Sequence, residues 1–141
     1  MLAFTLLELT TQIKKLFLDK CPGPSGKTHR MIQAGDAEFQ SLLLRLFNVI
    51  WESHVQPTDW QLSLMQLIYK GHDKDKTDPA SFRGIYLNDS LAKLFEGLLL
   101  ARLTTHTEVD NTLTSKQLGT KPCTQTHDAI YSLISTIQYN K

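Results

Sequence analysis

Apolar residues recur at helical spacing in several segments of the chain, separated by polar or proline-containing stretches. The strongest periodicity lies in residues 37–54, where Asp36 stands at the N-cap position and Pro57 lies just past the end. Weaker helical patterns occupy residues 3–18, residues 88–105 with Asn88 or Asp89 as the cap, and residues 126–139. In the strongest helix, the side chains expected on the core side are Phe39, Leu42, Leu43, Leu46, Phe47, Ile50 and Trp51.

Two shorter apolar stretches have the character of β-strands. Residues 61–69 carry polar interruptions at Ser63 and Gln66, and residues 83–87 follow a hydrophilic loop. A short loop without a helical pattern cannot easily make a parallel crossover, so the strands are expected to pair antiparallel. The sequence therefore predicts a predominantly helical α+β fold, with about four helices around a short β-hairpin, in a single domain over residues 1–141.

Two cations adjoin these strands. Lys70 directly follows the first strand and Arg83 opens the second. Arginine offers a planar fork of donors and lysine a point charge, and both suit the oxygens of a polyphosphate. Lys74 and Lys76 lie in the intervening loop among aspartates, so a solvated, nearly neutral loop is the favoured interpretation for those two lysines.

Composition places the chain among globular proteins and gives no sign of its partner. Hydrophobic residues make up 41% of its 141 residues and charged residues 21%, which is unlike a disordered chain. The formal net charge is +1, so a basic surface for nucleic acid would have to be local.

The metal-binding alternatives are weak. Cys21 and Cys123 are far apart in sequence, and free thiols in a reducing compartment are expected, with a disulfide between them as the alternative. Cys123 and His127 are spaced to share a helical face, as are His106 and Asp110. A structural zinc site needs four ligands, however, so chance spacing is favoured for both pairs.

The N-terminal segment does not have the pattern of a targeting or membrane sequence. No basic residue precedes its apolar stretch, and Glu8 and Gln12 interrupt that stretch. It is also too short in apolar length to cross a bilayer, so an amphipathic helix is expected. An intracellular protein without a membrane partner follows as the expectation, with nucleus or cytoplasm left open.

Residues 21–28 come close to a phosphate-binding P-loop, which is the rival motif in this chain. Its first glycine is replaced by Cys21, and Pro22 and Pro24 remove backbone N–H donors that such a loop needs. The segment that follows is weakly helical and soon broken by Gly35. The P-loop interpretation is therefore the less favoured one.

A series of short blocks runs through the chain in a characteristic order. The blocks are KCPGPSG at 20–26, the pair Pro57 and Trp60, YK at 69–70, DPASFRGIYL at 78–87, KLFE at 93–96 with RL at 102–103, and QLGT at 117–120 with QTHDAI at 125–130. In this order they resemble the N-terminal part, or fingers, of the reverse transcriptase domain of non-LTR (LINE-type) retrotransposons. The resemblance covers residues 13–141.

The resemblance implies roles for particular residues. Lys70 and Arg83 match the hairpin cations that contact the triphosphate of the incoming nucleotide in the family. Lys74, Lys76, Gln117 and Gly119 are weaker candidates for contacts with the template. The partners implied are a deoxynucleoside triphosphate and an RNA/DNA template-primer.

The chain also departs from the family's motifs. Ser25 replaces the aspartate of the PGPDG turn, Gly84 and Tyr86 replace the proline and serine of RPISL, and Thr120 replaces a phenylalanine. Gly84 is expected to loosen a strand that proline would stiffen. These differences indicate either sequence drift or a divergent element.

The catalytic carboxylates of the family fall outside this sequence. In the complete enzyme, palm aspartates hold two Mg²⁺ ions, and no such aspartate pair occurs before Lys141. The resemblance thus implies a partial domain without palm and thumb, inactive alone and with no cofactor of its own. Surface that the palm would cover invites self-association.

Two further interpretations stay open at this point. The chain could be a small helical protein-interaction domain, in which Trp51, Trp60 and the leucine-rich helices form the core or bind a partner. It could equally be a degenerate relic that no longer binds nucleic acid.

Overall fold

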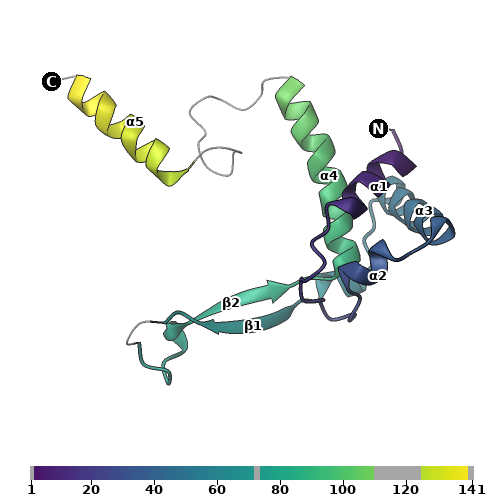
Figure 1. The fold of residues 1–141 in the computed structure, drawn as a ribbon, viewed down its shortest axis with the longest axis horizontal. Helices are drawn as coiled ribbons and strands as arrows, with labels where there is room; N and C mark the ends of the chain where they lie inside the picture. The colour runs from purple at the N-terminus through teal and green to yellow at the C-terminus, as the bar shows by residue number, and fades with distance from the viewer. Residues whose placement is uncertain (1, 72–73, 110–124, 140–141) are drawn as a thin grey trace. The chain divides into compact units, whose positions relative to one another are not determined.

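The computed structural model describes residues 2–71, 74–109 and 125–139 (Figure 1). They form five α-helices and one two-stranded sheet, which confirms the predominantly helical α+β fold. The α-helices are α1 (Leu6–Lys14), α2 (His29–Gln33), α3 (Ala37–Ser53), α4 (Ser90–Val109) and α5 (Thr126–Tyr139); the strands are β1 (Leu64–Tyr69) and β2 (Phe82–Leu87); two 3-10 turns are η1 (Thr58–Gln61) and η2 (Pro79–Ser81). The chain divides at Ala101 into two compact units, and each is described by itself.

Polar side chains begin the helices where the sequence placed them. Asp36 accepts a hydrogen bond from the Phe39 amide at 2.8 Å, and so begins α3 as predicted. At the start of α4 it is Asp89, of the two candidates, whose carboxylate accepts from the Leu91 amide at 2.8 Å. These caps satisfy amides that have no partner within the helix.

The first helix is shorter than residues 3–18, and the prediction was wrong at both ends. At its start, Thr5 and Glu8 form a reciprocal capping box, so the helix begins at Leu6. At its end, the Gln33 side-chain amide donates to the carbonyls of Ile13 and Leu16 at 2.9 and 3.1 Å. This contact from a distant residue satisfies the last carbonyls, which no local pattern reveals.

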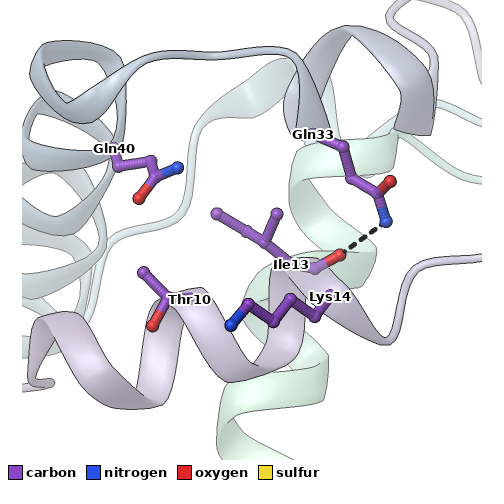
Figure 2. Close-up of a pocket in the computed structure, with 5 residues that line it drawn as sticks. All are labelled: Thr10, Ile13, Lys14, Gln33 and Gln40. Atoms are coloured by element: carbon purple, nitrogen blue, oxygen red, sulfur yellow. Dashed lines mark hydrogen bonds between the residues drawn. The ribbon is translucent and has the colours of Figure 1, made fainter.

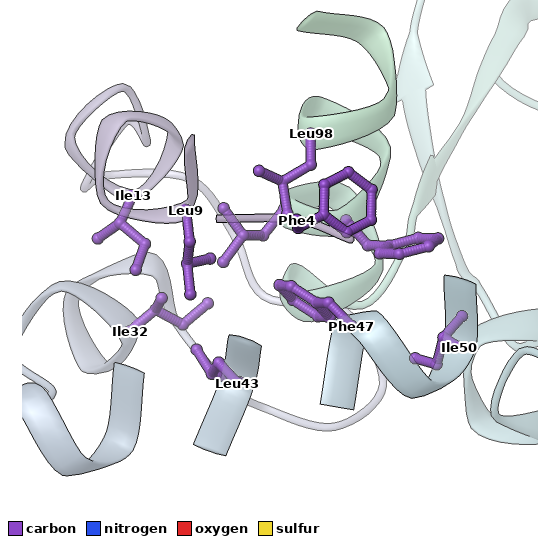
Figure 3. Close-up of a cluster of buried hydrophobic side chains, with 10 residues drawn as sticks. Phe4, Leu9, Ile13, Ile32, Leu43, Phe47, Ile50 and Leu98 are labelled. Atoms are coloured by element: carbon purple, nitrogen blue, oxygen red, sulfur yellow. The ribbon is translucent and has the colours of Figure 1, made fainter. Parts of the chain in front are cut away.

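The core of the first unit is built where α1, α2, α3 and α4 converge (Figure 3). Its buried side chains are Phe4, Leu9, Ile13, Ile32, Leu43, Phe47, Ile50, Leu94, Phe95 and Leu98. Each such side chain contributes about 1.5–3 kcal/mol by leaving water. Leu42 and Leu46, which the periodicity placed in the core, are 57% and 38% exposed. The apolar face of α3 is wider than the surface that covers it.

An aromatic group stands at the centre of this core. The ring of Phe95 lies 5.5–5.9 Å from the rings of Phe4, Phe47 and Trp60, in tilted or edge-on arrangements. Such geometries are the favoured ones for aromatic pairs. Trp60, in η1, thereby joins the segment before the hairpin to the helices.

The β-hairpin extends away from α1–α3 (Figure 1). The strands pair antiparallel, as predicted, with Leu64 opposite Leu87 and Tyr69 opposite Phe82. Because side chains alternate along a strand, the hairpin has two faces. We call the first the cation face: Leu64, Gln66, Ile68, Arg83, Ile85 and Leu87. We call the second the aromatic face: Met65, Leu67, Tyr69, Phe82, Gly84 and Tyr86.

The base of the hairpin is fixed to the turn at residues 22–26. Gly23 is buried there, and a Cβ atom at this position would lie 2.4 Å from the carbonyl oxygen of Asn88. The Ser63 hydroxyl donates to the Asn88 side chain at 2.7 Å, and the Ser90 hydroxyl donates to the Lys27 carbonyl at 2.6 Å. The turn, the strands and the start of α4 therefore share one junction.

Candidate functional site

Lys70 and Arg83 belong to the same face of the hairpin. The Lys70 amide donates to the Ser81 carbonyl at 2.9 Å, so the pairing continues one residue beyond β1. By alternation Lys70 falls on the cation face, diagonal to Arg83, which pairs with Ile68. Diagonal neighbours on one face have Cα atoms about 7–8 Å apart. Two long cationic side chains at this spacing can reach adjacent phosphate groups.

The two cations differ in their surroundings. The Lys70 side chain is half-buried, and its ammonium donates to the carbonyl oxygen of Ala80 at 2.6 Å. Arg83 is exposed, and its guanidinium makes no hydrogen bond or ion pair with any residue that the structure describes. The site thus combines one engaged cation with one that is open to a ligand.

The hairpin tip is folded on itself by its own polar groups. The Asp75 carboxylate accepts from the amide and the hydroxyl of Thr77 at 2.8 and 2.7 Å. These bonds, the backbone one first, lower the pKa of Asp75 below its ordinary value of 3.8. Asp78 accepts in the same way from the Ala80 amide at 2.9 Å. Both aspartates, which the sequence suggested as neutralising charges, also hold turns.

Of the two loop lysines, Lys76 directs its ammonium to the aromatic face and not to Lys70 and Arg83. The ammonium of Lys76 lies 5.6 Å from the ring centre of Tyr69, which belongs to the aromatic face. The Tyr69 hydroxyl donates to the carbonyl of Lys74 at 2.6 Å, which fixes the backbone at that residue. The other weak template candidates, Gln117 and Gly119, lie outside the described residues.

The aromatic face is a feature that the sequence motifs did not single out. The rings of Tyr69 and Phe82 lie 5.6 Å apart, and Tyr86 on the same face is 65% exposed. Gly84 stands between these positions, and a Cβ there would lie 3.2 Å from the Met65 sulfur. Strict alternation along β2 is the signal that would have revealed this face.

The recess between α1, α2 and α3 offers little to a ligand (Figure 2). Its volume is about 470 Å³, and its lining residues are Thr10, Ile13, Lys14, Gln33 and Gln40. The side-chain amide of Gln40 donates to the Gly35 carbonyl, as that of Gln33 does to the end of α1. The Thr10 hydroxyl donates to the Leu7 carbonyl. These donors hold the ends and turns of the helices.

The rival motifs gain no support from the described residues. The P-loop-like turn leads into α2, a helix of five residues that begins at His29, and its Gly23 faces protein backbone. Among residues 2–71, 74–109 and 125–139, no group of three metal-ligating side chains comes together. Cys123 and Asp110, one member of each suggested metal pair, lie outside these ranges. None of the described helices is long and apolar enough to span a membrane.

Comparison with known proteins points in one direction. No family model matches the chain. It is 32% identical over 117 residues to the RNA-directed DNA polymerase from mobile element jockey of Drosophila melanogaster, covering 83% of this chain and 13% of that protein. It is 27% identical over 96 residues to the Pol polyprotein of the type-1 element R1 of Bradysia coprophila, covering 68% and 10%. It is 28% identical over 130 residues to the probable RNA-directed DNA polymerase from transposon BS of D. melanogaster, covering 92% and 14%.

These relatives have in common that they are polymerases or Pol proteins of mobile elements. Over most of its length the chain is similar, at 25–32% identity, to reverse transcriptase and Pol proteins of non-LTR retrotransposons, as its sequence blocks indicated. It spans 10–15% of the length of the curated relatives that it matches.

Proposed function

We propose that the hairpin binds the triphosphate of an incoming nucleotide through Lys70 and Arg83, as the fingers part of an RNA-directed DNA polymerase. The observation that carries this proposal is the placement of both cations on one face of a projecting hairpin. Arg83 supplies a planar fork for two phosphate oxygens, and Lys70 supplies a point charge beside it. Similarity to RNA-directed DNA polymerases of mobile elements supports the choice of ligand.

The bond-forming step is proposed to lie elsewhere in the polymerase. Two Mg²⁺ ions held by aspartates would stabilise the attacking and leaving oxygens, and the described residues contain no cluster of three such ligands. We propose that this part of the polymerase binds nucleotide and template-primer and that primer extension requires the aspartates of the rest of the enzyme. Lys74 and Lys76 are proposed as secondary contacts with the template strand.

A binding measurement with matched charge variants tests the proposal. The chain is titrated with a deoxynucleoside triphosphate and with a fluorescent RNA–DNA template-primer at low and moderate salt. The variant is Lys70→Met/Arg83→Gln. The control, Lys15→Met/Arg45→Gln, removes the same charge from two exposed positions, Lys15 directly after the end of α1 and Arg45 on α3.

The expected result is a specific loss of binding in the hairpin variant. Losing two phosphate contacts should reduce the slope of log affinity against log salt by about one to two. The control should retain most of the affinity, because its lost charges lie outside the hairpin. Equal binding by the parent and the hairpin variant would show that Lys70 and Arg83 do not hold the ligand.

One observation favours a second function, protein interaction. Leu67, Met65 and Tyr86 on the aromatic face are all more than half exposed, with no charged residue among the strand positions of that face. Exposed apolar surface of this kind marks contact regions in many proteins. Absence of nucleotide and nucleic-acid binding at low salt would favour this alternative.

A further inference from the structure

Lys70 has a second partner, which makes it part of the hairpin tip as well as of the cation face. Its ammonium donates to the Ala80 carbonyl at 2.6 Å, while its amide donates to the Ser81 carbonyl. A charged donor makes this bond stronger than one between neutral groups. The side chain therefore holds the 3-10 turn η2 from outside the turn.

Few other contacts hold η2. Within the turn, the Asp78 side chain accepts from the Ala80 amide, and the Asp78 carbonyl accepts from the Ser81 amide, both at 2.9 Å. Ser81 is 3% exposed, whereas Pro79 and Ala80 are exposed. Removing the ammonium from Ala80 leaves a short turn held by the Asp78 bonds, by the Phe82 amide, which donates to the Pro79 carbonyl, and by the Lys70 amide at Ser81. A turn that loses one of so few bonds opens more often.

A phosphate group competes directly with this carbonyl. Its oxygens carry negative charge, so an ammonium binds them more strongly than it binds a neutral carbonyl oxygen. We propose that a polyphosphate captured by Arg83 draws the Lys70 ammonium away from Ala80 and thereby loosens η2. This inference rests on the proposed function. It means that the conformation of the hairpin tip changes when a ligand occupies the cation face.

Amide hydrogen exchange at Ala80 and Ser81 reports on η2 directly. The full chain is measured with and without inorganic tripolyphosphate, and binding of tripolyphosphate is measured separately by calorimetry. Lys70→Met removes the bond to Ala80 and keeps the length of the side chain. Lys70→Arg can still donate to that carbonyl, and Arg83→Gln weakens binding while leaving the bond in place.

Without ligand, exchange at both amides should be roughly tenfold faster in Lys70→Met than in the parent, because a charge-assisted hydrogen bond is lost. Lys70→Arg should restore most of the protection. Tripolyphosphate should accelerate exchange in the parent by a similar factor and leave Lys70→Met unchanged. Arg83→Gln should require a higher concentration for the same acceleration.

Two other results overturn the inference in distinguishable ways. A lysine ammonium has three donors and could bind phosphate while it keeps the carbonyl. In that case tripolyphosphate binds and Arg83→Gln weakens binding, but exchange at Ala80 and Ser81 does not change. The proposed function is then retained, and the inferred release of Lys70 from Ala80 is wrong. If the parent does not bind tripolyphosphate at all, both the proposed function and the inferred release of Lys70 from Ala80 are wrong.

Discussion

The side chain of Asn48 hydrogen-bonds to the backbone of the N-terminal segment, as the backbone of a neighbouring β-strand would. Its side-chain oxygen accepts from the Phe4 amide at 2.6 Å, and its side-chain nitrogen donates to the Phe4 carbonyl at 3.1 Å. One side chain thus satisfies both backbone groups of a residue that is 3% exposed. The ring of Phe4 is held against Phe95 and Trp51 as a consequence.

Asn48→Ala should therefore destabilise the fold by about 1–3 kcal/mol, because two backbone groups near the core lose their partners. Ser41→Ala, at an exposed position of the same helix, should change stability by less than about 0.5 kcal/mol. Urea unfolding followed by circular dichroism gives both values. Equal midpoints for the two variants would contradict this role of Asn48.

The tip has its own titrating group in Asp75. Its pKa is lowered in the folded tip, so its hydrogen bonds stabilise the tip above the unfolded pKa and are lost as the pH falls through the folded value. In an NMR titration, the carboxyl carbon of Asp75 should have its midpoint below 3.8. Thr77→Val removes the hydroxyl but keeps the amide, so the pKa should rise only partway toward 3.8. A midpoint that Thr77→Val leaves unchanged would exclude the hydroxyl as a cause.

Among the elements, the hairpin depends most on what is attached to its base. An isolated two-stranded hairpin is marginally stable, and here most side chains of β1 and β2 are exposed. The junction around Gly23 supplies the support, because the turn at 22–26 lies directly against Asn88 and Asp89. The strands are therefore held from one end.

Two glycine substitutions with opposite expected signs test this support. Gly23→Ala forces the turn away from the Asn88 backbone and should destabilise the fold by about 1–3 kcal/mol or more. Gly97→Ala places a methyl group in α4 at an ordinary 3.6 Å from Gln12 and should stabilise it by about 0.4–1 kcal/mol. Thermal unfolding of both variants measures these changes in stability. A Gly23→Ala variant as stable as the parent would contradict the close approach of Gly23 to the Asn88 backbone.

Local patterns predicted those parts of the fold that local chemistry decides. Asp36, the antiparallel strands and the final helix α5 follow from side chains close in sequence. The early end of α1 could not be predicted from local patterns, because the Gln33 side chain reaches it from another helix. The positions of Lys70 and Arg83 on one face could be derived from strand alternation, whereas the bond to Ala80 depends on the turn geometry at η2.

At the scale of the whole molecule, much apolar surface remains in contact with water. The aromatic face is one such surface, and the helix α5 of the second unit carries Ile130, Leu133 and Ile137 in exposed positions. Contiguous apolar surface favours association. The chain on its own is therefore expected to self-associate in solution.

Sedimentation velocity over a range of concentrations should show a rising average mass for the parent chain. Leu67→Lys places a charge on the aromatic face, where the side chain is 55% exposed, so it should reduce association without harming the fold. Val55→Lys introduces the same charge at a site 68% exposed and outside the hairpin, and should have little effect. A parent that stays monomeric, or variants that behave alike, would exclude association through this face.

The junction at Gly23 also has a consequence for how copies of this segment diverge. No side chain fits at residue 23 without moving the Asn88 backbone, so substitutions there are expected to be purged wherever the fold is still selected. The tip at residues 74–80 is exposed, and added residues there would leave the junction untouched. Among drifting copies, a retained glycine at residue 23 beside a tip of variable length would be the signature of a fold still under selection.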